Sequence, residues 1–88
     1  MKAQTFARIQ DAIANALGIS PFRVGMNSNF KTDLGADSLA MVAVAHALEE
    51  EFDVPLADGA PAIKTVAEAA LHIERALKLQ AEKEAAKP

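Results

Sequence analysis

The sequence contains no cysteine, tryptophan or tyrosine, and its only aromatic residues are four phenylalanines. The absence of cysteine excludes disulfides, thiolate metal sites and thiol nucleophiles built from the chain itself. Any thiol chemistry would therefore have to come from an attached group. Because alanine supplies much of the hydrophobic composition, we expect a small aliphatic core, close to the lower size limit for a stable domain.

Long apolar runs are also absent. Charged residues interrupt every hydrophobic stretch well before the roughly 20 residues that a membrane-spanning helix needs, and Met1-Lys2-Ala3 is not followed by the apolar core of a signal peptide. The length of 88 residues suits one domain. We therefore expect a cytoplasmic protein without a membrane span, with one domain over residues 1–80 and a charged, flexible tail over residues 81–88. The tail is either a frayed extension of the last helix or disordered.

Basic residues are missing from the middle of the chain. Residues 32–63 contain seven acidic residues and no lysine or arginine, whereas residues 1–31 contain four basic residues and one acid. Residues 64–88 contain five basic and four acidic residues. The acidic block disfavours nucleic-acid binding and favours protein partners with basic surfaces, although a plain solvated surface has the same composition.

Two segments carry the hydrophobic spacing of amphipathic helices. The first covers residues 3–17 and is followed by Gly18, a common residue at the end of a helix. The second covers residues 38–52, with Asp37 as its N-terminal cap. The core-facing residues of this second helix recur at helical intervals: Met41, Val44, Ala45, Leu48 and Phe52.

The remaining segments predict a long loop, a short helix and a third main helix. The loop covers residues 18–36, has a helical turn near Pro21 and is anchored by three apolar residues: Val24, Phe30 and Leu34. Residues 56–63 have room for one short helical turn. A capping-box pattern begins at Thr65 and opens the last helix. We therefore predict an all-α fold, a four-helix bundle with three main helices, one short helix and a long first loop.

Asp37-Ser38-Leu39 lies where the second helix begins, and a helix N-terminus stabilises a bound phosphate. Catalysis by this serine lacks a partner, because His46 lies roughly 12 Å further along the same helix and His72 belongs to the last helix. The chain also lacks a nucleophile elbow, a glycine-rich phosphate loop and histidine pairs with metal-ligand spacing. We expect no enzyme and no metal site, which leaves a covalently modified serine or an ordinary helix cap.

Three segments carry a likeness to a known family: Phe30–Leu39, Ala47–Asp53 and Thr65-Val66. They resemble the prosthetic-group site, the end of the second helix and the start of the last helix of acyl carrier proteins. The likeness covers about residues 3–77. It implies that a phosphopantetheinyl transferase attaches 4′-phosphopantetheine from coenzyme A to Ser38. It also implies that the arm's thiol carries acyl groups as thioesters for enzymes of fatty-acid, lipid or polyketide-type biosynthesis.

The same resemblance implies a monomer that presents a docking surface to enzymes with basic surfaces. We assign six residues to that surface: Asp37, Leu39, Val42, His46, Glu49 and Glu50. Ala40 and Ala43 stand where fatty-acid carriers typically have acids, and His46 replaces a large apolar residue. This thinned surface suggests a specialised carrier for a dedicated pathway, with neutral drift at these positions as the alternative.

A further expectation concerns the space between the second and last helices. Six residues are predicted to line an acyl-chain pocket there: Met41, Val44, Ala45, Leu48, Ala69 and Ile73. Small and flexible side chains can separate to admit an alkyl chain, and methionine adapts well to such changes. The alternative is that the six side chains only fill the core.

Two other functions remain open at this point. A peptidyl or aryl carrier would share the fold and the arm, although the acid directly before Ser38 favours the acyl class. An unmodified helical module would instead bind partners through a patch on the second helix: Leu39, Val42 and His46.

Overall fold

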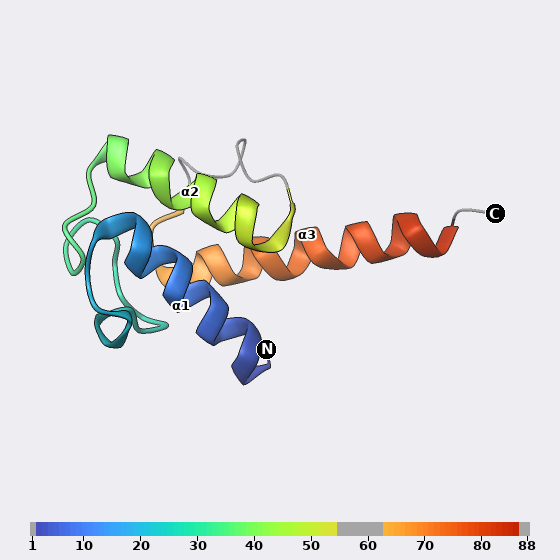
Figure 1. Cartoon of the computed structure of the whole chain (residues 1–88), viewed down its shortest axis with the longest axis horizontal. Helices are drawn as coiled ribbons and strands as arrows, with labels where there is room; N and C mark the ends of the chain where they lie inside the picture. Colours follow the sequence, from blue (N-terminus) through green and yellow to red (C-terminus); the bar gives the residue numbers. More distant parts are fainter. Residues whose placement is uncertain (1, 55–62, 87–88) are drawn as a thin grey trace.

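The computed structural model describes residues 2–54 and 63–86, with side chains described as far as Glu82. Within these ranges the chain forms three α-helices and one 3-10 turn, and no β-strand. The elements are α1 (Ala3–Leu17), η1 (Pro21–Arg23), α2 (Ser38–Phe52) and α3 (Val66–Ala86). Figure 1 shows α1 and α2 beside the first part of α3, whose remainder extends beyond both. The all-α prediction is confirmed, while the short helix predicted over residues 56–63 lies almost wholly outside the described residues.

The bounds predicted for α1 are confirmed, and local hydrogen bonds explain where it ends. Gly18 has a positive φ of 68° and donates its N–H to the carbonyl oxygen of Ala14. Glycine adopts this left-handed conformation without the steric cost that a Cβ atom brings. The predicted turn near Pro21 is also present, because the Ser20 hydroxyl oxygen accepts the N–H of Phe22 at 3.3 Å.

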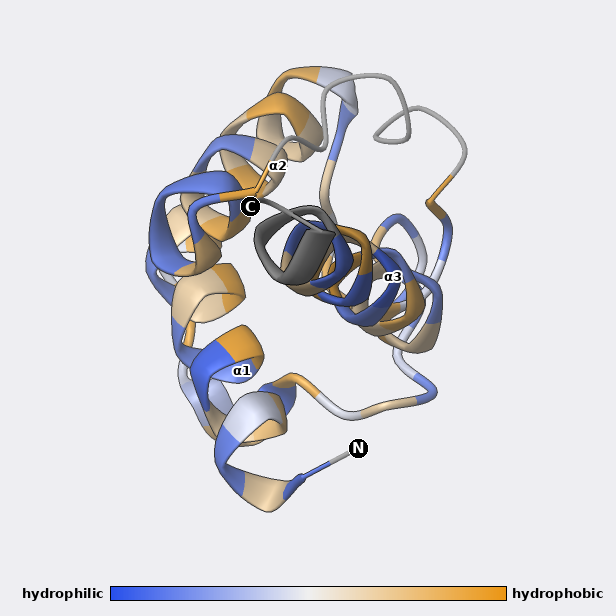
Figure 2. Cartoon of the chain, turned by 90° about the vertical axis from the view of Figure 1, so that its right-hand side faces the viewer, coloured by the Kyte–Doolittle hydropathy of each residue, from blue (hydrophilic) through white to orange (hydrophobic). Residues whose placement is uncertain are grey.

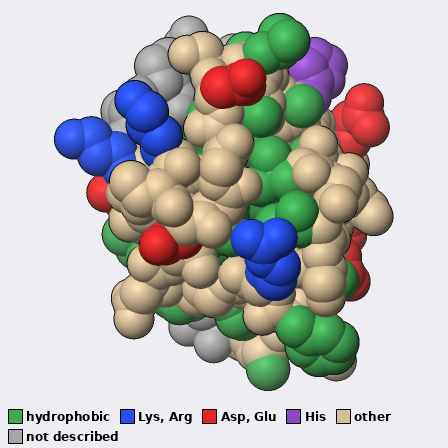
Figure 3. Space-filling model, turned by 90° about the vertical axis from the view of Figure 1, so that its left-hand side faces the viewer, with side chains coloured by type: hydrophobic (Ala, Val, Ile, Leu, Met, Phe, Trp, Pro, Cys, Tyr) green, Lys and Arg blue, Asp and Glu red, His purple; other side chains and the backbone are tan. Residues whose placement is uncertain are grey.

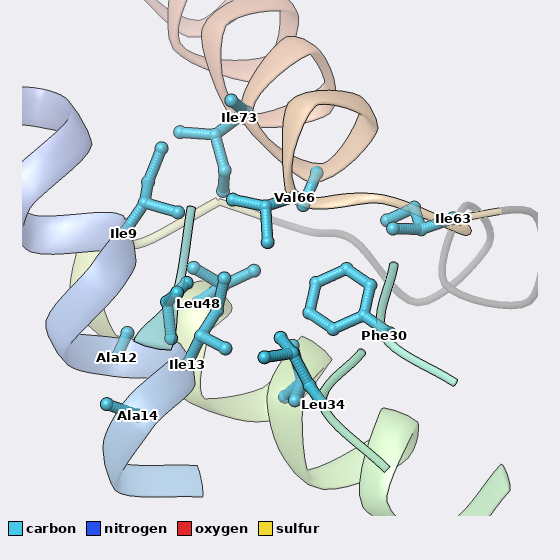
Figure 4. Packing of buried hydrophobic residues seen from close by; sticks show 14 of the residues in the cluster. Ile9, Ala12, Ile13, Ala14, Phe30, Leu34, Leu48, Ile63, Val66 and Ile73 are labelled. Carbon is cyan, nitrogen blue, oxygen red and sulfur yellow. The ribbon is translucent and has the colours of Figure 1, made fainter. Parts of the chain in front are cut away.

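The long loop between α1 and α2 is held down by buried side chains. The three predicted anchors are all buried: Val24, Phe30 and Leu34. Figure 4 shows the Phe30 ring among Leu34, Ile63 and Val66, at one end of a cluster that also contains Ile9 and Ile73. Viewed along the long axis, α1 and α2 lie on one side of α3, and all three helices carry hydrophobic residues among hydrophilic ones (Figure 2). Burial of this kind makes a long loop a fixed part of the scaffold.

The C-terminal end of α2 is bound to α1 by Arg8. Its Nε lies 2.8 Å from Oε1 of Glu51, and its second guanidinium nitrogen donates to the Glu51 carbonyl oxygen at 2.7 Å. The guanidinium carbon also lies 4.4 Å from the centre of the Phe52 ring. A cation at a helix C-terminus interacts favourably with the negative end of the helix dipole. Glu51 is therefore part of the scaffold that holds α1 and α2 together.

Helix α3 begins at the predicted cap and is longer than its hydrophobic stripe. Thr65 Oγ1 accepts the Glu68 N–H at 3.2 Å. The Glu68 carboxylate accepts the backbone N–H of Lys64 at 2.8 Å, whereas in a capping box it would accept the N–H of Thr65. The backbone stays helical through Ala86, so the domain boundary predicted at residue 80 falls inside α3 and stays a prediction. No helix in the described part of the chain is long and apolar enough to cross a membrane.

Candidate functional site

Ser38 is the first residue of α2, and its side chain is exposed. The residue before it forms the cap, as predicted: Asp37 Oδ1 accepts the N–H of Ala40 at 2.8 Å. Caps of this kind contribute about 1 kcal/mol to helix stability. The remaining free N–H groups of the first turn and the helix dipole favour negative charge beside Ser38. The serine hydroxyl is thus accessible at a position that suits a phosphate ester.

The loop before Ser38 is organised by Asn29. Its side-chain oxygen accepts the N–H groups of Lys31 and Thr32 at 2.9 and 3.0 Å, and its own N–H donates to Asp33 Oδ2 at 2.7 Å. Gly35 then has a positive φ of 69°, which allows the chain to turn toward α2. These local bonds shape the loop that leads to Ser38 at the start of α2.

An exposed apolar face continues from Ser38 along α2. Leu39 is 78% exposed and Val42 is 57% exposed, while His46 is exposed one turn further on. Figure 3 views the end of the molecule where α2 begins and shows hydrophobic side chains gathered there, with acidic and basic side chains around them. Isolated exposed leucines are common on proteins, but a row on one helix face marks a candidate contact surface.

The acidic residues predicted for this surface differ in their surroundings. Glu50 is exposed and its Oε1 lies 4.0 Å from Nδ1 of His46, whereas Glu49 is half-buried. Both residues line an open groove of about 380 Å³ with His46, Asp53 and Val54. Asp37 is exposed, but its carboxylate already caps α2. Five of the six predicted docking residues therefore lie on α2, with Glu49 and Glu50 toward its C-terminal end, while Asp37 caps its start.

An open pocket of about 330 Å³ lies directly beside Ser38. Its apolar lining comes from Phe30, Ala36, Met41 and Ile63, and its polar lining includes Asn29, Thr32, Asp37, Lys31 and Lys64. Neither lysine was predicted from the sequence to belong to the site. They are the basic residues that flank the acidic block of residues 32–63. That position in the sequence is the one feature that could have indicated their place at the site.

The six residues predicted to line an acyl-chain pocket lie in or next to the core. Five of them are buried and Met41 is half-buried: Met41, Val44, Ala45, Leu48, Ala69 and Ile73. Of these, only Met41 also lines the open pocket beside Ser38. Met41 is therefore the one residue shared by the predicted acyl-chain pocket and the open pocket beside Ser38.

Neither histidine lies in the pocket of Ser38. His46 lines the groove at the far end of α2, and His72 lines a separate pocket on α3 with Glu68, Leu71 and Arg75. A serine nucleophile needs a base within hydrogen-bond reach. The pocket is lined by the hydroxyl residues Ser38 and Thr32, by Asp37, by two lysines and by an apolar floor, and no imidazole reaches it.

Comparisons with known proteins agree with this geometry. A family model described as "Phosphopantetheine attachment site" matches residues 7–73. The chain is 41% identical to an acyl carrier protein of Trieres chinensis over 75 residues, which cover 84% of this chain and 94% of that protein. It is also 41% identical to an acyl carrier protein of Bdellovibrio bacteriovorus over 69 residues, or 77% and 88% of the two chains. Because the matches span most of the domain and include the loop and helix that present Ser38, the chain belongs to the acyl carrier protein family.

Proposed function

We propose that Ser38 is the residue that bears the 4′-phosphopantetheine arm of this acyl carrier protein. The observation that supports this assignment is an exposed hydroxyl at the first residue of α2, beside an open pocket. When bound, the arm supplies the terminal thiol on which acyl groups are carried as thioesters. The chain itself has no cysteine, so the arm provides the chemistry that the polypeptide lacks.

The residues around Ser38 fit a phosphodiester. The free N–H groups of the first turn of α2 point toward solvent, where the helix dipole favours an anion. The nearest carboxylate, on Asp37, is engaged with the Ala40 N–H, and two lysines lie in the same pocket. The chain's contribution is therefore to hold and direct the arm, while tethering raises the local concentration of the acyl group at each enzyme.

Enzymatic loading followed by peptide mapping tests the assignment. The protein is incubated with coenzyme A and a phosphopantetheinyl transferase of broad specificity, then digested and analysed by mass spectrometry. We expect one phosphopantetheine per chain, on the peptide that contains Ser38. Modification of any other serine or threonine, or no modification at all, would contradict the proposal. A modified chain would also exclude the unmodified-module alternative, and the names of the relatives support an acyl rather than a peptidyl or aryl carrier.

We further propose that the transferase and the acyl-processing enzymes dock on the exposed face of α2. Replacing Val42 with aspartate should weaken binding of the transferase by about tenfold or more, because a central apolar contact contributes strongly to small interfaces. Rising salt should weaken the wild-type complex as well, since acidic residues steer basic partners. Surface plasmon resonance at several salt concentrations measures both effects.

A leucine elsewhere provides the matched control for the docking surface. Leu71 is 59% exposed on α3, close to the 57% of Val42, so Leu71→Asp introduces the same charge at a comparable position away from α2. Equal weakening by both variants would argue against the proposed surface. The presence of Ala40, Ala43 and His46 in α2, where fatty-acid carriers typically have acids and a large apolar residue, supports a dedicated pathway. Normal elongation of this carrier by housekeeping fatty-acid synthase enzymes would exclude that idea. We also expect the protein to be a cytoplasmic monomer, and light scattering tests this oligomeric state through the molar mass in solution.

We also propose that an acyl chain can enter between α2 and α3. The six residues assigned to this pocket are small or flexible, and Met41 connects them to the opening beside Ser38. An octanoyl chain on the arm should shift the methyl resonances of Val44, Leu48 and Ile73, because these side chains must separate to admit it. Unchanged resonances at all three residues would show that they only fill the core.

A further inference from the structure

The fold brings together two lysines from opposite ends of the acidic block. Residues 32–63 contain no lysine or arginine, and Lys31 and Lys64 stand immediately outside that range. Both residues line the pocket that contains Ser38. Backbone hydrogen bonding brings the two segments together. The Phe30 N–H donates to the Lys64 carbonyl oxygen at 3.0 Å, and an isolated bridge joins Asn29 and Thr65.

The backbone holds both lysines in place and leaves their side chains exposed. The N–H of Lys31 donates to the Asn29 side chain at 2.9 Å, and the N–H of Lys64 donates to Glu68 at 2.8 Å. Among the residues that the structure describes, neither ammonium group has a carboxylate within ion-pair distance. Two positive charges therefore stand at the pocket that contains Ser38, at the two edges of the acidic block.

Each of the described carboxylates nearest to the two lysines in sequence accepts a backbone N–H, and that of Glu68 accepts the N–H of Lys64 itself. Asp33 accepts the N–H of Asn29, and Asp37 accepts the N–H of Ala40. A phosphodiester on Ser38 would add an anion to the pocket that both lysines line, and lysine binds phosphate as a compact point charge. The pocket floor of Phe30, Met41 and Ile63 is apolar and matches the branched, methyl-bearing pantoyl group that follows the phosphate in the arm.

We propose that Lys31 and Lys64 bracket the phosphodiester of the arm and lay its pantoyl group onto this apolar floor. The arm then leaves Ser38 toward the loop before α2 and the start of α3, on the side of the pocket. Both lysines act as positioning residues, since they touch the arm and take no part in a reaction. The inference rests on the proposed attachment of the arm to Ser38.

Nuclear Overhauser contacts from labelled pantoyl methyl groups test the proposal. The holo protein is prepared with ¹³C-labelled pantoyl methyls, and contacts are recorded to the methyl groups of Met41 and Ile63. In the double variant Lys31→Gln/Lys64→Gln, the contact intensities should fall by about threefold or more, the size expected when two exposed charge contacts are removed. The matched control Lys2→Gln/Lys78→Gln makes the same charge change at two other exposed lysines and should retain the contacts.

The outcomes separate this inference from the assignment of Ser38. Intact mass of the same sample reports whether the arm is present, so a chain that cannot be loaded overturns both proposals. A loaded wild-type protein without methyl contacts, or equal intensities in the two double variants, overturns only the role of the lysines. Contacts that appear only when the arm ends in a carboxylate-bearing acyl group would assign the lysines to the cargo and also overturn the proposal.

Discussion

Replacing Ser38 with alanine should abolish loading of the arm completely. The phosphodiester needs a hydroxyl oxygen, and no other side chain occupies the first position of α2. Alanine is a favourable helix residue and Ser38 is exposed, so the free energy of unfolding should change by no more than about 0.5 kcal/mol. Intact mass spectrometry after incubation with coenzyme A and a transferase measures the loading, and thermal unfolding checks the fold.

Thr32 offers a matched control for this experiment. It is a second exposed hydroxyl that lines the same pocket, and Thr32→Ala should load like the wild-type protein. The two variants remove one hydroxyl each from the same neighbourhood, so a difference between them isolates the position at the helix start. Loading of the Ser38→Ala protein, or failure of the Thr32→Ala protein, would show that the arm is attached elsewhere.

Replacing Phe30 with alanine should destabilise the protein by about 3–5 kcal/mol, the range for removal of a buried aromatic side chain. Phe30 is only 2% exposed and is the largest fully buried side chain in the described residues. Such a loss is large compared with the total stability of about 5–15 kcal/mol that is usual for domains. It should also loosen the loop that places Ser38, because Phe30 joins that loop to Ile63 and Val66 (Figure 4). Urea unfolding followed by circular dichroism measures the change.

Phe22 provides a control of the same residue type in the same loop. It is 98% exposed, so Phe22→Ala should change the unfolding free energy by less than about 0.5 kcal/mol. If the Phe30→Ala protein does not fold, Phe30→Leu retains most of the buried volume and should still be measurably less stable than the Phe22→Ala protein. Similar losses at the two positions would contradict the packing described for the loop.

The elements that were predictable from the sequence depend on residues close together in the chain. The stripe of α1 and its stop at Gly18 lie within one helix, and the cap of Asp37 on Ala40 spans three residues. Their patterns follow from the 3.6-residue helical repeat and from the hydrogen-bonding needs of helix ends. The position of Ser38 at the start of α2 belongs to the same class, whereas its identification as a modified residue came from the resemblance to acyl carrier proteins.

The sequence could not distinguish residues whose roles depend on distant contacts. Phe30 was predicted as a buried anchor of the loop, but no local pattern indicated that Phe22, eight positions earlier, would be 98% exposed. Arg8 and Glu51 are separated by 43 residues and form an ion pair across α1 and α2. The continuation of α3 through Ala86 also exceeds the hydrophobic stripe that predicted it.

Local spacing and capping thus determined the helices and the serine at the start of α2. The surroundings of that serine were decided by tertiary packing, because Lys31 and Lys64 reach one pocket only when the chain between them folds back and the Phe30 N–H meets the Lys64 carbonyl. A hydrogen bond across 34 positions has no signature in the short-range periodicity of a sequence, since it depends on how the buried side chains of the whole bundle fit together.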